Sequence, residues 1–345
     1  MPPNPLAADL DHILAHTAGL WEELRGQRIF ITGGTGFFGC WLLESFAWAN
    51  RKLDLHAQAV VLSRNPQALA KKAPRLTANK AITFHTGDVR DFQFPAGSFS
   101  HVIHAATEAS VKLNEESPLV MLDTIVEGTR RALDFAVACG AKKFLFTSSG
   151  AVYGKQPPEM THLPEEYHGA PDPLDSANAY GEGKRAAELL CALYHRQHGL
   201  EPKIARCFAF VGPYLPLDAH FAVGNFIRDA LRGGPIEVKG DGTPYRSYLY
   251  AADLAIWLWT ILFHGASIRP YNVGSADDHP LAEMARLVAA AAGGCRVQID
   301  GAPAGGPLAR YVPNVGRACA ELDLRVWIDL PEGLKRTLDF WKGKC

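Results

Sequence analysis

The chain has 345 residues, 48% of them hydrophobic, with a formal net charge of −1 and seven cysteines. This length allows one large or two ordinary domains with a substantial core, and the near-zero charge argues against a protein whose main task is to hold nucleic acid. The cysteines show no metal-binding spacing and the N-terminus shows no signal-peptide pattern, so we expect no metal site, a reducing compartment and a cytoplasmic protein.

Residues 8–25 show helical apolar spacing, which predicts a helix in an N-terminal extension (1–27) outside the main fold. The pattern then changes at Arg28–Thr32, an apolar run without alternation that is typical of a strand covered on both faces. Further strands are expected at 57–64, 82–90, 101–106, 143–149 and 203–212, and helices at 40–50, 65–72, 118–139 and 180–199. The repeated alternation predicts an α/β fold with a doubly wound parallel Rossmann sheet.

The composition of the sequence changes after Gly212, where proline and glycine become frequent and the apolar segments shorten. We therefore predict a Rossmann dinucleotide-binding domain at 28–212 and a smaller substrate-binding lobe at 213–345, with short returns to the sheet. The longest apolar run, 254–263, is far shorter than the ~20 residues that a membrane span requires. It predicts a buried helix, and we expect no membrane partner.

Glycines stand at positions 33, 36 and 39 of the stretch TGGTGFFG, between a predicted strand and a predicted helix. Gly33 permits a tight turn, Gly36 lets the backbone approach a pyrophosphate, and Gly39 allows the helix to pack against the strand. Backbone N–H groups at the helix N-terminus then bind the phosphates of a dinucleotide. The predicted cofactor site also includes Phe37, Phe38, Val89, Ala105 and Ala106.

The second strand ends in Leu62-Ser63-Arg64-Asn65 and carries no carboxylate. An acidic residue at this place accepts from the ribose 2′-OH of NAD, whereas Arg64, with Ser63 beside it, suits the 2′-phosphate of NADP. The sequence therefore favours NADP, but NAD stays open because an arginine can also stack on adenine. Asp88, after the third strand, is placed to reach the adenine or to cap a helix.

Ser149 ends the strand 143–149, and Tyr180 and Lys184 lie one helical turn apart at the start of the next long helix. A free tyrosine titrates near ~10, too high for a base at neutral pH. An ammonium one turn away favours the phenolate and lowers that pKa, so Tyr180 can remove a hydroxyl proton while hydride leaves the same carbon. Ser149 would hold the substrate oxygen, and Lys184 would also reach the nicotinamide ribose.

Together these motifs resemble the extended short-chain dehydrogenase/reductases, in particular the nucleotide-sugar epimerase/dehydratase family. The glycine motif TGxxGxxG matches 32–39, and the set Ser…YxxxK matches Ser149, Tyr180 and Lys184. Further similar stretches are 104–110, 148–154, 240–255, 271–274 and 331–341. The resemblance covers nearly the whole chain after residue 27.

The resemblance implies that the C-terminal lobe grips a nucleotide-diphosphate sugar. Arg246 matches the arginine that usually contacts the diphosphate, and Arg310 looks like a second phosphate contact. Gly150 lies beside Ser149 in the implied substrate site. The family also implies a homodimer joined by two helices from each subunit, here about 118–139 and 180–199.

Departures from the family pattern help to choose a reaction. Dehydratases carry an Asp-Glu pair straight after the serine and decarboxylases usually keep a glutamate there, but this chain has Gly150-Ala151. This pair favours chemistry that needs only a tyrosine and a hydride. Ile125 stands where the family often has an asparagine that orders a water next to the lysine, with Thr124 as a substitute to consider, and Ala209 replaces a second asparagine.

Three hypotheses follow from this pattern. The first is a nucleotide-sugar 4-epimerase with a tightly held NAD(P) that is reduced and re-oxidised in each cycle. The second is a NADPH-dependent 4-keto sugar reductase or a 4,6-dehydratase-like enzyme. The third is a cofactor-binding sensor without catalysis, which an intact Ser149, Tyr180 and Lys184 disfavour.

Overall fold

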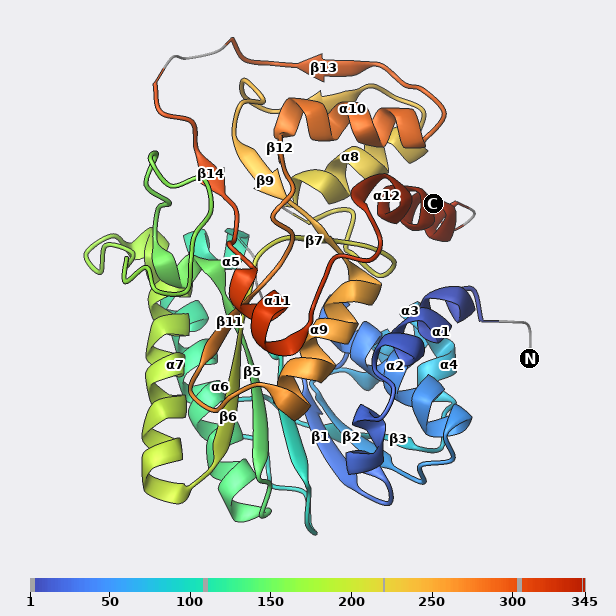
Figure 1. The fold of residues 1–345 in the computed structure, drawn as a ribbon, viewed down its shortest axis with the longest axis vertical. Helices are drawn as coiled ribbons and strands as arrows, with labels where there is room; N and C mark the ends of the chain where they lie inside the picture. Colours follow the sequence, from blue (N-terminus) through green and yellow to red (C-terminus); the bar gives the residue numbers. More distant parts are fainter. Residues whose placement is uncertain (1–3, 108–110, 220, 303–305, 343, 345) are drawn as a thin grey trace. The chain divides into compact units, whose positions relative to one another are not determined.

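A seven-stranded sheet lies at the centre of the computed structural model, which describes residues 4–107, 111–219, 221–302, 306–342 and 344. The strand order is β11-β6-β5-β4-β1-β2-β3 (Figure 1). The strands are β1 (Arg28–Thr32), β2 (Gln58–Ser63), β3 (Ile82–Thr86), β4 (His101–His104), β5 (Lys143–Ser149), β6 (Glu201–Cys207) and β11 (Pro270–Val273). Strands β1 to β5 pair in parallel, and the sheet grows outward in both directions from β1. The predicted doubly wound fold is therefore confirmed.

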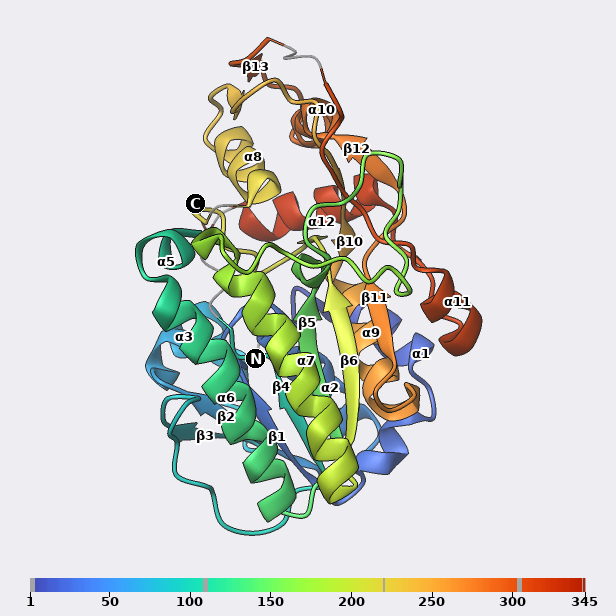
Figure 2. The same ribbon diagram turned by 90° about the vertical axis from the view of Figure 1, so that its left-hand side faces the viewer.

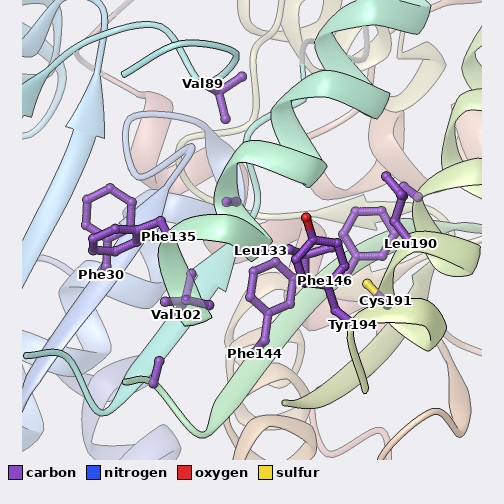
Figure 3. Close-up of a cluster of buried hydrophobic side chains, with 14 of the residues drawn as sticks. Phe30, Val89, Val102, Leu133, Phe135, Phe144, Phe146, Leu190, Cys191 and Tyr194 are labelled. Carbon is purple, nitrogen blue, oxygen red and sulfur yellow. The ribbon is translucent and has the colours of Figure 1, made fainter. Parts of the chain in front are cut away.

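Two long helices, α6 (Pro118–Ala138) and α7 (Ala179–His198), run side by side over one face of the sheet (Figure 2). Their amphipathic faces join the sheet in one buried cluster (Figure 3), which includes Phe30, Val102, Leu133, Phe135, Phe144, Phe146 and Leu190. Helix α2 (Phe37–Lys52) follows β1 and lies behind the sheet in the same view. It is joined there by α9 (Ala251–His264), whose Trp259 donates a hydrogen bond to Ser45 of α2 at 2.8 Å.

The apolar spacing of the N-terminal extension predicted a single helix outside the main fold, and this prediction is wrong. The extension forms α1 (Ala7–His16) and a separate 3-10 turn, η1 (Leu20–Leu24), because Gly19 takes φ = 86° and ends the helical path between them. Trp21 of the turn is fully buried, and its ring centroid lies 4.7 Å from that of Trp259. The extension is thus part of the core around α9.

The chain divides into two compact units whose segments interleave along the sequence. The first unit comprises 1–154, 169–206 and 255–271, and the second comprises 155–168, 207–254 and 272–345. The strand predicted at 203–212 accordingly ends at Cys207, and its last part becomes β7 (Phe210–Val211), which pairs with β10 (Leu249–Tyr250). The assignment of cofactor and substrate roles to 28–212 and 213–345 stays a prediction.

The second unit holds short strands and four helices within the described residues. Two of its sheets are β12-β9-β14 and β13-β8. The elements are α8 (Ala222–Leu231), β8 (Ile236–Val238), β9 (Tyr245–Ser247), β12 (Asp278–Pro280), α10 (Leu281–Ala291), β13 (Val297–Ile299), β14 (Arg310–Tyr311), α11 (Gly316–Leu322) and α12 (Leu330–Trp341). The first unit also contains α3 (Pro66–Lys72), α4 (Pro74–Thr77), α5 (Val111–Glu116), η2 (Gly150–Tyr153) and η3 (Ser176–Asn178).

The apolar run at 254–263 lies in α9 and is buried, as predicted. Across the part of the chain that the structure describes, no helix combines the length and the apolar character needed to cross a membrane. The same residues contain no cluster of three or more His, Cys, Asp or Glu side chains suited to holding a metal ion.

Candidate active site

The loop between β1 and α2 and the first turn of that helix have no room for a side chain at Gly33, Gly34 or Gly39. Gly33 takes φ = 73°, and a Cβ on it would lie 2.3 Å from the Ala105 carbonyl oxygen. A Cβ on Gly39 would lie 2.3 Å from the Gly33 carbonyl oxygen, and Gly36 is the N-cap of α2. The backbone can therefore approach a ligand closely where the N–H groups of the first turn of α2 point. A dinucleotide pyrophosphate fits this cradle.

A buried hydrogen-bond chain fixes the cradle to the neighbouring strand. The Ala106 N–H donates to Thr32 Oγ1 at 3.2 Å, and Thr32 Oγ1 lies 2.8 Å from His104 Nδ1. His104 Nε2 lies 3.0 Å from Thr129 Oγ1 of α6. Burial, with a smaller effect from the Lys184 charge, lowers the pKa of His104 to about 3. The imidazole is thus neutral, and one of its ring nitrogens donates while the other accepts in this chain of hydrogen bonds.

The end of β2 presents the predicted adenosine side of the site. Ser63 is buried, and its Oγ accepts from the Asn65 N–H at 3.1 Å, while Arg64 is exposed. A Cβ on Gly34 would lie 2.5 Å from Val61 Cγ1, so the cradle lies directly against β2. The structure therefore places Ser63 at the end of the strand that borders the cradle and Arg64 just beyond it.

Asp88 forms a turn after β3, which ends that strand earlier than predicted. Its Oδ1 accepts from the Arg90 N–H at 3.0 Å and from Arg90 Nε at 2.9 Å. The hydrogen bond from Arg90 lowers the pKa of Asp88, against the opposing effect of burial. Val89 packs into the helix layer, because a Cβ on Gly128 of α6 would lie 2.8 Å from its Cγ1. Phe37 and Phe38 open α2, with ring centroids 5.8 Å apart.

The three predicted catalytic residues lie in the first unit. Ser149 is at the C-terminal end of β5, and Tyr180 and Lys184 are in the first two turns of α7. Ser149 is the last residue of β5, and its Oγ accepts from the Ala151 N–H at 3.1 Å at the start of η2. Tyr180 is the second residue of α7 and is half-buried. Lys184 follows one turn later, with only 2% of its surface exposed. Its Nζ lies 5.9 Å from the centroid of the Tyr180 ring, so the ammonium is close enough to favour the phenolate.

The start of α7 is held by residues that the sequence did not single out. Asn114 of α5 accepts from the Tyr180 N–H at 3.1 Å and donates to the Ala177 carbonyl at 2.7 Å. Lys184 Nζ donates to the Thr147 carbonyl and to Thr107 Oγ1, both at 2.8 Å. Asn114, Thr147 and Thr107 are all distant in sequence from the residues that they hold, so only the fold could identify these contacts.

A second network joins the strand that carries Ser149 to the catalytic helix. Ser148 Oγ donates to Glu188 Oε1 at 2.6 Å, and the Arg206 guanidinium donates to both oxygens of Glu188 at 3.0 and 2.7 Å. Glu188 lies one turn beyond Lys184 on α7, and Arg206 lies on β6. A fully paired ionic network of this kind fixes the two strands and the helix together.

The two family asparagines that this chain lacks are replaced by apolar residues. Ile125 is 1% exposed and packs against Gly183 of α7, so no polar group takes that place. The Thr124 hydroxyl donates to the Val120 carbonyl of its own helix at 2.7 Å. Ala209 lies in the second unit, where its carbonyl accepts from the Leu249 N–H at 3.0 Å.

Arg246 and Arg310 lie on neighbouring strands of the second unit. In the β14–β9 register, Arg310 pairs with Tyr245 and Tyr311 pairs with Arg246. The Arg310 guanidinium carbon lies 4.0 Å from the Tyr245 ring centroid, and the side chain forms an ion pair with Asp278 of β12. The structure thus gathers the predicted cofactor and catalytic residues, with Gly150 of η2, in one unit and both arginines in the other.

Comparison with known proteins agrees with this geometry. The family model described as "NAD dependent epimerase/dehydratase family" matches residues 29–274. A UDP-glucuronic acid decarboxylase 5 from Arabidopsis thaliana is 32% identical over 76% of this chain and 74% of its own length. A UDP-glucuronic acid decarboxylase 1 from Xenopus tropicalis is 29% identical over 93% of this chain and 73% of its own length.

Solved structures show the same fold. The dTDP-glucose 4,6-dehydratase DesIV from Streptomyces venezuelae, solved with NAD and TYD bound, has a TM-score of 0.77 and 25% identity over 92% of this chain and 97% of its own. The UDP-glucose 4-epimerase from Thermus thermophilus, solved with NAD, has a TM-score of 0.75 and 26% identity over 92% of this chain and 100% of its own. On these matches and the residues above, the chain belongs to the NAD-dependent epimerase/dehydratase family.

Proposed function

We propose that the protein is a nucleotide-sugar epimerase that acts at sugar C4 and uses Tyr180 as general base and general acid. The observation that carries this proposal is the Lys184 ammonium, which is buried one helical turn after Tyr180 and bonded to the Thr147 carbonyl of β5, the strand that ends at Ser149. A bound nicotinamide dinucleotide would accept a hydride from C4 and return it. The cradle around Gly33 would hold its pyrophosphate, and Lys184 would contact its ribose.

The residues of this chain would then act as follows. Ser149 donates a hydrogen bond to the substrate oxygen and orients the hydroxyl toward Tyr180. The Tyr180 phenolate takes the hydroxyl proton as the C4 hydride leaves, and the phenol returns that proton when hydride arrives on the opposite face of the sugar. Arg246 and Arg310 would bind the two phosphates of the nucleotide sugar, because a guanidinium suits phosphate oxygens. Arg310 would exchange its ion pair with Asp278 for the phosphate.

The residues after Ser149 favour epimerisation over dehydration or decarboxylation. Gly150 and Ala151 begin η2 and carry no acid or base. The curated relatives named above are decarboxylases, and the similar DesIV is a dehydratase. Neither reaction is favoured here, because each needs further proton transfer or stabilisation of charge close to the sugar, and the residues next to Ser149 supply none.

A 4-keto reductase is the second candidate, because Ser63 and Arg64 suit a 2′-phosphate and hence NADPH. Denaturing the purified protein and identifying the released dinucleotide separates the two. Stoichiometric bound cofactor supports the epimerase, whereas a protein that is isolated empty and needs added NADPH supports the reductase. Deuterium at C4 of a UDP- or dTDP-hexose should stay in the product of an epimerase, since the same hydride returns.

Tyr180→Phe tests the assignment of the base. We expect a fall in kcat of about 10²- to 10⁴-fold, the usual contribution of a positioned acid–base group, with the Kd for the dinucleotide nearly unchanged. Tyr194→Phe is the matched control on the same helix, since the Tyr194 hydroxyl bonds Asp134 away from Ser149. Full activity of Tyr180→Phe would refute the mechanism.

We further propose that α6 and α7 form the interface of a homodimer. Their surfaces expose large apolar side chains, with Leu119 73%, Leu189 61% and Leu193 40% exposed. Leu189→Glu should convert the protein to a monomer in size-exclusion chromatography with light scattering. Leu174→Glu is the control, because Leu174 is 93% exposed but lies outside both helices. A dimeric Leu189→Glu variant would exclude this surface.

A further inference from the structure

Lys184 is held by two hydrogen bonds that come from different parts of the sheet. One acceptor is the Thr147 carbonyl within β5, and the other is Thr107 Oγ1 in the segment after β4. An ammonium has three donors and no acceptor, so in the second bond Thr107 must accept. The Thr107 hydroxyl hydrogen points to the Ala106 carbonyl at 2.8 Å, which leaves an oxygen lone pair for the lysine.

Thr107 is also tied to the phosphate cradle. Its N–H donates to the Ala105 carbonyl at 3.1 Å, and that carbonyl oxygen is the atom that a Cβ on Gly33 would meet. Thr107 therefore links the segment beside the glycine cradle, through its N–H, to the catalytic helix α7, through its hydroxyl. The ring of Phe146 also contacts the ammonium, since Lys184 Nζ lies 4.8 Å above its centroid, within the range of a cation–π interaction.

No polar side chain replaces the missing family asparagine on the α6 side of Lys184. Ile125 fills that place, and the Thr124 hydroxyl is bonded within its own helix. Thr107, in the segment after β4 and 77 positions earlier in the sequence, accepts a hydrogen bond from the lysine. We propose that Thr107 is a positioning residue that orients the Lys184 ammonium toward Tyr180 and so keeps the phenol easy to ionise.

The other ionisable side chains near Lys184 are either neutral or already paired, so they do not orient its ammonium. His104 stacks on Phe146 with the ring centroids 5.8 Å apart, and its pKa of about 3 keeps it neutral. Burial raises the pKa of Cys191, which lies further along α7, so the thiol is also neutral. Glu188 is paired with Arg206. Among the residues near Lys184 that the structure describes, the Tyr180 phenol is then the group expected to change charge during the reaction.

The test compares four variants in the full-length protein with its cofactor. Thr107→Val keeps the shape but removes the acceptor, and Thr107→Ser restores an acceptor in a smaller side chain. Thr124→Val is the control, because it removes a threonine hydroxyl that does not contact Lys184. Thr107→Ala serves as a second removal variant, and thermal melting checks that each protein folds.

We expect Thr107→Val to lower kcat about 10- to 100-fold, the usual effect of losing a group that orients a catalytic residue. The acidic limb of the pH–rate profile should move to higher pH by about one unit, since the phenol becomes harder to ionise. Thr107→Ser should recover most of the rate, and Thr124→Val should match the parent.

A double variant separates this inference from the proposed function on which it rests. If Thr107 acts through the lysine, Thr107→Val should change kcat less than about two-fold in a Lys184→Ala background. A full additional loss there, or a parental rate and pH profile for Thr107→Val alone, would overturn the positioning role. Activity retained by Tyr180→Phe would instead overturn the proposed mechanism.

Discussion

Gly183 of the catalytic helix lies directly against Ile125 of α6. A Cβ on Gly183 would be 3.1 Å from Ile125 Cδ1 and 3.3 Å from its Cβ, and both residues face the buried seam between the two helices. The missing side chain lets α7 approach α6 closely, and Lys184 is the next residue. Ile125, which stands where the family often has an asparagine, therefore packs directly against a glycine here.

Gly183→Ala tests this contact. In an open helix the change stabilises by about 1 kcal/mol. Here the β-branched Ile125 cannot turn away, so we expect a net loss of about 1–2 kcal/mol in the free energy of unfolding. In an Ile125→Ala background the contacts with Cδ1 and Cγ2 are gone and only the 3.3 Å contact with Cβ remains, so Gly183→Ala should cost clearly less there than in the parent. Chemical denaturation of the four proteins measures the coupling, and additive effects would contradict the close contact.

Arg64 provides a prediction about the cofactor. The residue follows β2 directly, and β2 ends without the carboxylate that would accept from a ribose 2′-hydroxyl. We expect 2′,5′-ADP to bind more tightly than 5′-ADP in isothermal titration calorimetry. Arg64→Ala should weaken 2′,5′-ADP about ten-fold or more, the scale of one lost charge-assisted contact, and leave 5′-ADP unchanged.

Arg75→Ala is the control for this titration, since it removes an arginine from α4 rather than from the end of β2. Equal affinity of the parent protein for the two ligands would favour NAD, in agreement with the name of the family.

Local patterns were enough to predict the sheet and the principal motifs. The strand at Lys143–Ser149 and the start of α7 at Ala179 match the prediction closely, because buried parallel strands and long amphipathic helices carry strong periodic signals. The extension was predicted less well. Its apolar spacing continues through Gly19, and the spacing gives no sign that this glycine turns the chain with φ = 86°.

The missing parts of the site depend on contacts between residues far apart in the sequence. Thr107 and Lys184 are separated by 77 positions, and Tyr180 and Asn114 by 66. A single sequence contains no signal for such pairs, because each side chain alone is an ordinary polar residue in a loop or helix. The interleaved units have the same cause, since segments such as 255–271 join the first unit through packing.

Trp21 should make the N-terminal extension necessary for stability. The side chain is fully buried against Trp259, and its Nε1 donates to Thr17 Oγ1 at 2.8 Å. Trp21→Ala should cost about 3–5 kcal/mol in the free energy of unfolding, as expected for removing a large aromatic side chain from a core. Trp48→Ala should cost clearly less, since Trp48 is only half-buried. Similar losses for both would contradict a core role for the extension.

Glu23 gives the extension a pH-dependent attachment to the sheet. Its carboxylate accepts from Lys143 Nζ at 2.8 Å and lies 2.9 Å from His101 Nε2. Burial acts to raise the pKa of Glu23, but the hydrogen bonds and charges of Lys143 and His101 outweigh it, and the pKa is lowered from its usual 4.5. A carboxyl with a lowered pKa stabilises the fold above its unfolded pKa, and that contribution is lost as the pH falls through the folded value.

Glu23→Gln should therefore lower Tm at pH 7, and its difference from the parent should shrink as the pH falls below about 4.5. Glu22→Gln is the matched control in the same 3-10 turn, because Glu22 forms an exposed ion pair with Arg25 and such pairs contribute little. Melting curves between pH 7 and low pH measure both. A difference that widens in acid would show that Glu23 is not the ionised partner of Lys143, because only an ionised carboxyl with a lowered pKa loses its stabilising effect on protonation.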